Sequence, residues 1–219
     1  MRRLIVFGVI ILCLSSVMVA NEMIEKGKSY YFSGNFELAK ISLEKALKST
    51  TNDEILLMLG NSYLATGEPR KAINIFKEGI YLGSRGWIFE FNLAYAYYAV
   101  KDYTNSLSHF LSVKEKMPSF SKTYWFGGMS ALRIADVSTT VFLWERYLEI
   151  APGGEESENI RKALALLKEF GTNVIPEILK ELAGESSDLE LLIKGIENGF
   201  EIKSEQKTLE DTSLEDIEK

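Results

Sequence analysis

A repeat of about 34 residues runs through the middle of the chain and constrains its fold more than any other feature. Small residues recur at separations of 33, 34 and 34 positions: Gly27, Gly60, Ala94 and Gly128. Large apolar residues recur further on at the same separations of 33, 34 and 34: Leu43, Phe76, Phe110 and Trp144. Self-similarity at a fixed period of this length is typical of proteins built by stacking one supersecondary unit.

Each copy has the pattern of a pair of helices. Apolar residues recur every three or four positions, as on one side of a helix, across 21–33, 53–66, 86–99 and 120–133. A turn signal follows in most copies, such as Thr66-Gly67-Glu68-Pro69, and a second amphipathic stretch such as RKAINIFKEGIYL comes next. The sequence therefore predicts an all-α protein made of helical hairpins.

The register and the residue types together resemble the tetratricopeptide repeat (TPR). That pattern has a Leu-Gly pair, a Tyr three residues after the Gly, an Ala, a Phe four residues later and a terminal Pro. The matching residues of the second and third copies are Leu59, Gly60, Tyr63, Ala72 and Phe76, and Leu93, Ala94, Tyr97, Phe110 and Pro118. The first copy departs at Lys26 and Leu43, and the fourth at Gly127, Ala131, Thr140 and Trp144. The resemblance implies a right-handed solenoid of helical hairpins over 21–152.

This resemblance also divides the chain into parts. The four expected repeats cover 21–52, 53–86, 87–120 and 121–152. Residues 153–200 are expected to form capping and C-terminal helices, because the end of a solenoid needs a helix with one polar side. Residues 201–219 carry seven acidic residues against three lysines and no aromatic residue, so we expect a disordered acidic tail.

The first twenty residues differ from the rest. MRRLIVFGVIILCLSSVMVA has two arginines, an apolar run and Ala20 before a polar stretch, which is the layout of a secretory signal. The apolar run over 4–20 is also at the short limit for crossing a bilayer, so an uncleaved anchor is the alternative. In both cases we expect export to the periplasm or to the outer side of the cytoplasmic membrane.

Few residues suit catalysis or metal binding. The single cysteine, Cys13, lies within the export segment, and the single histidine, His109, lies in a predicted second helix beside Phe110. Gly153-Gly154 is not followed by the Lys-Ser/Thr pair of a phosphate-binding loop. With a net charge of -6 and scattered basic residues, nucleic acid is a poor partner. We therefore predict no enzymatic activity, no cofactor and no metal site.

The aromatic stretch WIFEFNLAYAYYAV, over 87–100, predicts a binding surface. In a TPR stack the first helix of each pair lines the concave side. Four residues of the third copy are spaced 3, 4 and 3 positions apart, on one helical face: Ile88, Phe91, Tyr95 and Tyr98. The same register in the other copies completes the predicted groove with Ile24, Lys28, Tyr31, Leu57, Asn61, Leu64, Trp125 and Met129. An exposed apolar strip of this kind usually marks an interaction site.

By resemblance, such grooves hold peptides or helices of partner proteins. Some family members grip a C-terminal carboxylate with Lys and Asn side chains, but Ile24 and Ile88 occupy positions where that clamp has lysine. The expected function is a scaffold or adaptor of the cell envelope that binds a segment of another protein. The alternative is a structural, self-associating protein whose groove is filled by its own segment 173–199. Burial of the groove residues bears on this choice.

Overall fold

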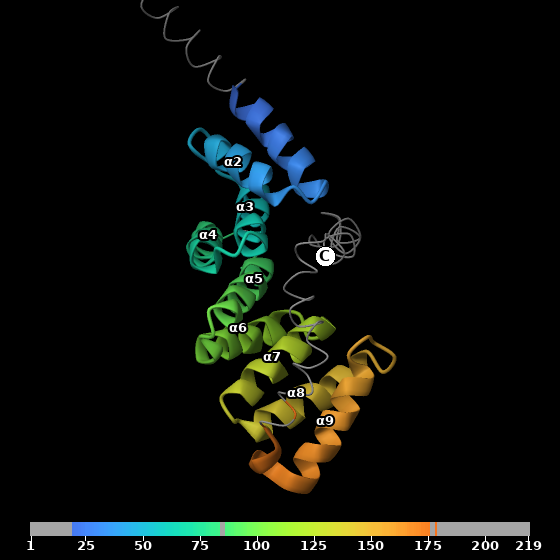
Figure 1. The fold of residues 1–219 in the computed structure, drawn as a ribbon. Coiled ribbons are helices and arrows are strands. Elements are labelled where there is room, and N and C mark those ends of the chain that lie inside the picture. The colour runs from blue at the N-terminus through green and yellow to red at the C-terminus, as the bar shows by residue number, and fades with distance from the viewer. Residues whose placement is uncertain (1–18, 84–85, 176–177, 179–219) are drawn as a thin grey trace, which may run out of the picture. The chain divides into compact units, whose positions relative to one another are not determined.

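The computed structural model describes residues 19–83, 86–175 and 178, and every element in these ranges is a helix (Figure 1). These residues fall into two compact units, which divide between Glu68 and Pro69. The predicted all-α fold of helical hairpins is confirmed. The predicted export segment up to residue 18, most of the segment 173–199 and the acidic tail lie outside the described ranges.

The N-terminal unit holds a helix over 19–32, α2 (Phe36–Leu47) and α3 (Asp53–Ala65). Its helices begin where the sequence supplies caps. The Asn35 side chain accepts a hydrogen bond from the Leu38 amide at 3.3 Å, and Asn52 accepts one from the Ile55 amide at 2.8 Å. Gly27 allows the first helix to approach α2 closely, because a Cβ there would lie 2.6 Å from Cδ2 of Leu43.

Over residues 69–174, the C-terminal unit continues the pattern with six α-helices. They are α4 (Pro69–Leu82), α5 (Gly86–Ala99), α6 (Tyr103–Lys116), α7 (Ser121–Arg133), α8 (Val137–Ile150) and α9 (Ser157–Phe170), followed by the 3-10 helix η1 (Gly171–Val174). Each α-helix packs on the next one along the chain. The acidic caps Asp102 and Asp136 accept hydrogen bonds from the amides of Asn105 and Thr139, at 3.3 and 3.1 Å.

One backbone conformation recurs in the turns between paired helices. Four residues adopt a positive φ, at 75°, 74°, 64° and 60°: Gly34, Gly67, Lys101 and Ala135. Their separations of 33, 34 and 34 residues follow the repeat. Glycine adopts this left-handed conformation without strain, whereas a residue with a Cβ does so at a cost. The repeat is therefore present in the backbone as well as in the side chains.

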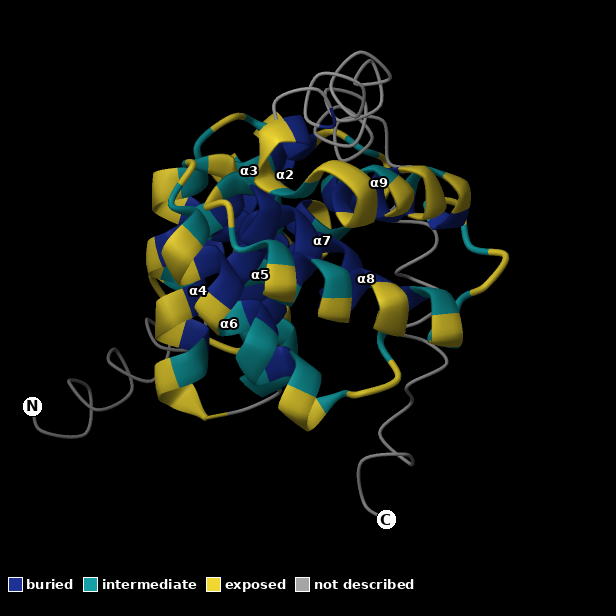
Figure 2. Ribbon diagram, turned by 90° about the horizontal axis from the view of Figure 1, so that it is seen from below, coloured by how far each residue is buried: buried dark blue, intermediate teal, exposed yellow. Residues whose placement is uncertain are grey.

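The core of the C-terminal unit consists of large side chains that fill space left by small ones. Phe89, Phe110 and Trp144 are at most 1% exposed, and Figure 2 shows that the buried residues lie on the helix sides that face neighbouring helices. Phe89 packs against Gly79, where a Cβ would lie 2.2 Å from its Cε1. In α9 the buried residues Ile160, Leu164 and Leu167 form one side of the helix, which packs on α8 as a capping helix does.

A candidate interaction surface

In the N-terminal unit, the polar members of the predicted groove are already engaged with their own chain. The Asn61 amide donates a hydrogen bond from Nδ2 to the Tyr31 hydroxyl at 3.1 Å. Lys28 Nζ lies 2.7 Å from a carboxylate oxygen of Glu54 and 3.8 Å from one of Glu25. These two groups therefore stabilise the packing of the first helix on α3, and they are not free recognition groups in this structure.

In the C-terminal unit, Phe126 of α7 joins the aromatic residues of α5 into one cluster. Its ring centroid lies 6.2 Å from that of Phe91, 5.2 Å from that of Tyr95 and 6.5 Å from that of Tyr98. All three pairs have the edge-to-face geometry that aromatic quadrupoles favour. Phe110 of α6 stacks on the same Phe126 ring at 5.9 Å, so the cluster joins three helices.

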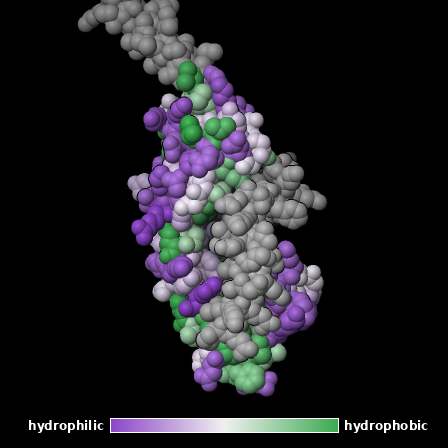
Figure 3. Space-filling model, in the orientation of Figure 1, coloured by the Kyte–Doolittle hydropathy of each residue, from purple (hydrophilic) through white to green (hydrophobic). Residues whose placement is uncertain are grey.

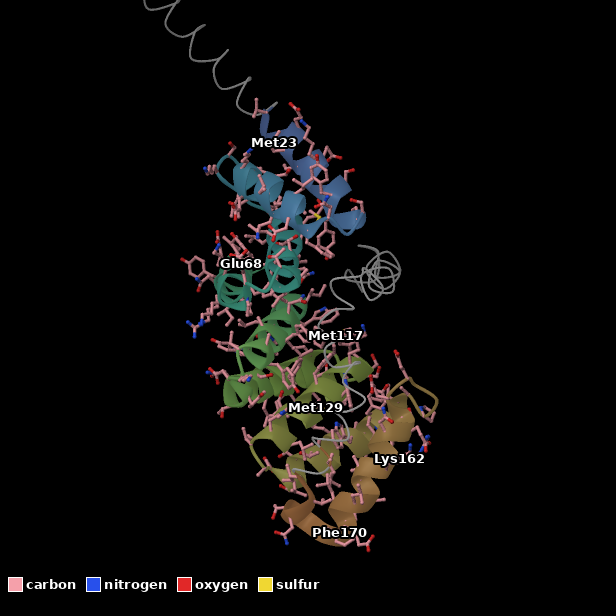
Figure 4. All side chains as sticks on the ribbon, in the orientation of Figure 1. Met23, Glu68, Met117, Met129, Lys162 and Phe170 are labelled. Carbon is pink, nitrogen blue, oxygen red and sulfur yellow. The ribbon has the colours of Figure 1, made fainter. Side chains whose placement is uncertain are left out.

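We call the surface formed by six of the predicted residues the α5–α7 face: Ile88, Phe91, Tyr95 and Tyr98 of α5, and Trp125 and Met129 of α7. Trp125 stacks on Trp144 at 5.7 Å between ring centroids, and the Trp144 indole donates to the Trp125 carbonyl at 3.3 Å. Met129, labelled in Figure 4, is 1% exposed. Ile88 is half-buried.

The residues of the predicted groove are more buried than the residues of an open, exposed strip would be. Eight of the twelve are at most 9% exposed: Ile24, Tyr31, Leu57, Phe91, Tyr95, Tyr98, Trp125 and Met129. The other four are half-buried: Lys28, Asn61, Leu64 and Ile88. In α5 these residues are buried because the helix is apolar on two faces. Phe91 and Tyr95 therefore contact aromatic rings of neighbouring helices. Binding of a partner at these residues stays a prediction.

The exposed large apolar side chains lie elsewhere and are scattered. Tyr81 of α4 is 89% exposed and Phe142 of α8 is 56% exposed, while Leu38 and Ile41 lie on the outer side of α2. Figure 3 shows hydrophobic side chains as separate spots among hydrophilic ones on the visible, described surface. Single exposed apolar residues are normal in soluble domains and do not mark a site.

Four buried side-chain atoms that can form hydrogen bonds lack a partner among the described residues. They are Tyr98 OH, Thr123 Oγ1, Trp125 Nε1 and Arg133 Nε. All four belong to α5 or α7, and Tyr98 and Trp125 are members of the α5–α7 face. Nearly all buried polar groups in folded proteins are paired, so each of these four atoms needs an explanation, and all four lie on α5 or α7.

Tyr98 and Arg133 lie together at one end of this face. Burial raises the pKa of the Tyr98 hydroxyl, and the nearby Arg133 guanidinium partly opposes this rise. The guanidinium carbon of Arg133 lies 5.7 Å from the ring centroid of Tyr103, and the Tyr103 ring contacts that of Tyr98 at 5.3 Å edge to face. A buried hydroxyl and a guanidinium therefore meet on an aromatic surface.

Groups suited to catalysis do not gather in the described part of the chain. No three His, Cys, Asp or Glu side chains within it are placed so that they could hold a metal ion. His109 stacks on the Tyr97 ring at 5.6 Å, with an interplanar angle of 6°. Burial lowers the pKa of His109.

Within the described ranges, no helix combines the length and the apolar content that a bilayer span requires.

Two residues of this surface were absent from the predicted groove. Phe126 directly follows Trp125 and contacts three groove residues. Arg133 is the last residue of α7 and lies four positions beyond Met129, the last residue of the predicted groove. The i, i+4, i+8 spacing of Trp125, Met129 and Arg133 is the signal that connects Arg133 to the face.

Comparison with known proteins identifies the repeat. Residues 23–53 and 53–82 match the family model described as tetratricopeptide repeat. A search of curated proteins finds no match.

Several solved structures of other proteins share the fold over most of the length of this chain. The crystal structure of MamA protein is 18% identical, with a TM-score of 0.63 over 77% of this chain and 92% of that chain. MamA from Desulfovibrio magneticus RS-1 is 14% identical, with a TM-score of 0.63 over 78% and 96% of the two chains. YrrB, described as a TPR protein with an unusual peptide-binding site, is 19% identical, with a TM-score of 0.62 over 68% and 76%. Residues 23–82 therefore match tetratricopeptide repeats, and the shared fold and the repeating hairpins of the described chain agree with a tetratricopeptide repeat protein of several repeats.

Proposed function

We propose that this protein is a non-catalytic adaptor that binds a segment of another protein on the α5–α7 face. The observation that carries this proposal is the concentration of unpaired buried hydrogen-bonding atoms on α5 and α7. Leaving such an atom unpaired costs about 1–3 kcal/mol, so a chain that only needs to pack has no use for four of them. A bound segment recovers this free energy by supplying acceptors.

The chemistry of these atoms indicates what the segment must present. Trp125 Nε1 and Arg133 Nε can only donate, whereas the hydroxyls of Tyr98 and Thr123 can donate or accept. Backbone carbonyl groups of an extended or helical segment are suitable acceptors, and the aromatic rings around Phe126 suit apolar side chains. Half-buried Ile88 and Arg133 border the buried residues, and access to the face is expected from there.

The family supports the same kind of function. YrrB, which shares the fold, is described as having a peptide-binding site. From the first twenty residues we infer that the adaptor works on the outer side of the cytoplasmic membrane, either released or held by residues 4–20. Its partner is then another protein of the cell envelope. Fractionation of the native host, with the N-terminal mass of the recovered protein, tests this location and shows whether cleavage follows Ala20.

The binding function is tested by selecting peptides from a random twelve-residue library against the purified protein and measuring their affinities by calorimetry. Replacing Trp125 by Phe keeps an aromatic ring and removes the unpaired indole N–H. We expect the affinity of selected peptides to fall roughly five- to tenfold, which corresponds to one hydrogen bond of about 1–1.4 kcal/mol. A variant that keeps its helicity and binds the peptides as wild type does contradicts the proposal, as does a library without binders.

The matched control makes the same chemical change at another indole. Trp87 lies in the first turn of α5, is half-buried and packs against Phe120 at 5.5 Å between ring centroids. Its indole nitrogen is not among the unpaired buried atoms. Trp87→Phe should leave peptide affinity within about twofold of wild type, since no hydrogen bond to the peptide is expected there. Equal losses in both variants would assign the effect to packing and would count against the proposed site.

A further inference from the structure

We propose that Arg133 and Tyr98 form a subsite for one carboxylate, and that the bound segment places an Asp or Glu side chain there. This inference rests on the proposed function and deepens it, because it gives the partner segment a definite chemistry. The Nε–H of Arg133 would donate to one carboxylate oxygen and the Tyr98 hydroxyl to the other. A carboxylate can accept from both, and charge-assisted hydrogen bonds of this kind are the stronger ones in proteins.

The first support is that Arg133 has no carboxylate of its own. Among the described residues, no Asp or Glu oxygen lies within 4.0 Å of its guanidinium. Two arginines of neighbouring helices differ in this respect, since Arg146 pairs with Glu149 and Arg161 with Glu158. Those two are largely exposed, whereas Arg133 is half-buried and its Nε is fully buried. A positive charge at such a place is stabilised by a partner of opposite charge.

The second support is the surroundings of the subsite. Tyr98 is 7% exposed, and its hydroxyl lies close enough to the Arg133 guanidinium that the charge and hydrogen bonding of Arg133 oppose the rise of its pKa, although the two groups do not form a hydrogen bond of good geometry. The Tyr103 ring lies against both residues, with 5.7 Å to the guanidinium carbon and 5.3 Å to the Tyr98 ring. Rings on this side suit the methylene groups of a Glu or Asp side chain. One cation and one neutral donor match a single negative charge better than a phosphate, which carries nearly two.

The third support is the position of the subsite on α7. Trp125, Met129 and Arg133 are four residues apart, which places them along one side of the helix. At 1.5 Å per residue, Arg133 lies about 12 Å along the helix axis from Trp125. An extended segment covers this distance with about four residues. The acidic residue is therefore expected about four positions from the carbonyl group that accepts from Trp125, within the segment and not at its C-terminus.

The test compares peptides selected from the same library, with amidated C-termini, against their Glu→Gln or Asp→Asn versions. We expect the selected peptides to share one acidic position, and its amide version to bind wild type on the order of tenfold to a hundredfold more weakly. Arg133→Gln should weaken the acidic peptide by a similar factor and remove most of the difference between the two versions. Arg146→Gln, on α8, is the control for loss of one positive charge and should change neither affinity.

The possible outcomes separate this inference from the proposed function. Peptides that depend on Trp125 but bind equally well in acidic and amide form would overturn the carboxylate subsite and leave the adaptor function standing. If no peptide depends on Trp125, the proposed function itself fails. Circular dichroism of Arg133→Gln and of Tyr98→Phe shows whether each variant folds, so that two independent variants report on the subsite.

The Nε–H resonance of Arg133 in the full chain tests two other occupants. We expect it to be independent of protein concentration and unchanged when the acidic residues of 201–219 are replaced by amides. A shift on dilution would assign the subsite to a second copy of the chain. A shift on neutralising 201–219 would assign it to the chain's own acidic end. Each of these results contradicts a carboxylate supplied by another protein.

Discussion

Gly128 of α7 and Trp144 of α8 are in such close contact that a Cβ atom on Gly128 would lie 2.2 Å from Nε1 of Trp144. Trp144 is fully buried, and its indole nitrogen donates to the Trp125 carbonyl at 3.3 Å. This contact therefore holds α7 and α8 together as the helical hairpin that the sequence predicts for the fourth repeat. The hydrogen bond to the Trp125 carbonyl also holds the backbone of the α5–α7 face in place. Gly27 and Leu43 make the corresponding close contact in the first hairpin.

Gly128→Ala is predicted to destabilise the protein by about 1–3 kcal/mol, because the added methyl group forces Trp144 out of its position. The measurement is urea unfolding followed by circular dichroism. Gly153→Ala is the control, since a Cβ at Gly153 has no atom within 4 Å and should change the free energy of unfolding by less than about 0.5 kcal/mol. A Gly128→Ala variant as stable as wild type would show that the contact is not tight.

Ala135→Gly is predicted to stabilise the protein by up to about 1 kcal/mol, because Ala135 adopts a φ of 60° in the turn before α8. Glycine takes this conformation without strain, as Gly34 and Gly67 do in the equivalent turns. Ala165→Gly, at an exposed position inside α9, should instead lower the free energy of unfolding by about 1 kcal/mol. Thermal unfolding of both variants measures the two changes in stability. A change in the same direction in both variants would contradict this prediction.

Tyr98→Phe is predicted to leave the free energy of unfolding unchanged or to raise it by up to about 1 kcal/mol, because the hydroxyl that it removes is buried and unpaired. Tyr124→Phe is the matched control, since the Tyr124 hydroxyl donates to the Pro118 carbonyl at 2.8 Å. The free energy of unfolding of that variant should be about 1 kcal/mol lower than that of wild type. A clear loss of stability in Tyr98→Phe, measured by urea unfolding, would mean that its hydroxyl has a partner in the folded chain.

His109 is predicted to titrate below its ordinary pKa of 6.5 in the folded protein, because burial disfavours its charged form. Lys77 and Lys116 act in the same direction, and Glu90 opposes them. The unfolded chain then binds a proton more readily, so the free energy of unfolding decreases as pH falls from about 6.5 through the folded value. His109→Gln should lose this part of the pH dependence.

The measurement is simple because His109 is the only histidine. Its imidazole proton resonance in an NMR titration gives the folded pKa directly. A midpoint at or above 6.5 would contradict the assignment of His109 as a histidine packed against Tyr97.

The fold was predictable because the repeat places similar residues at equivalent points of each hairpin. Gly27, Gly128 and their large partners keep one register, and the first helices of the second, third and fourth repeats begin within one residue of the expected positions. Left-handed residues at the turns were recognisable only at Gly34 and Gly67. At Lys101 and Ala135 the same conformation is imposed by the hairpin against the preference of the residue.

The surface was less predictable, since sequence periodicity assigns a residue to a face but not a degree of burial. Phe91 and Tyr95 were expected in a strip, and they are buried in ring contacts with Phe126. Polar replacement of these two residues would therefore disturb packing as well as any binding. The unpaired atoms of Tyr98 and Trp125 could not be foreseen, because hydrogen-bond partners depend on the geometry of α5 against α7.

The most direct measurement of the central claim is site-specific photo-crosslinking from position 95 in the native host, with position 81 as the control. Tyr95 belongs to the α5–α7 face, whereas Tyr81 of α4 is 89% exposed and lies outside it. The account predicts that position 95 captures one protein of the cell envelope, that position 81 does not, and that a peptide from the captured segment of that protein competes. Capture only of residues 173–199 of the same chain would contradict it, because the face would then be part of the protein's own core.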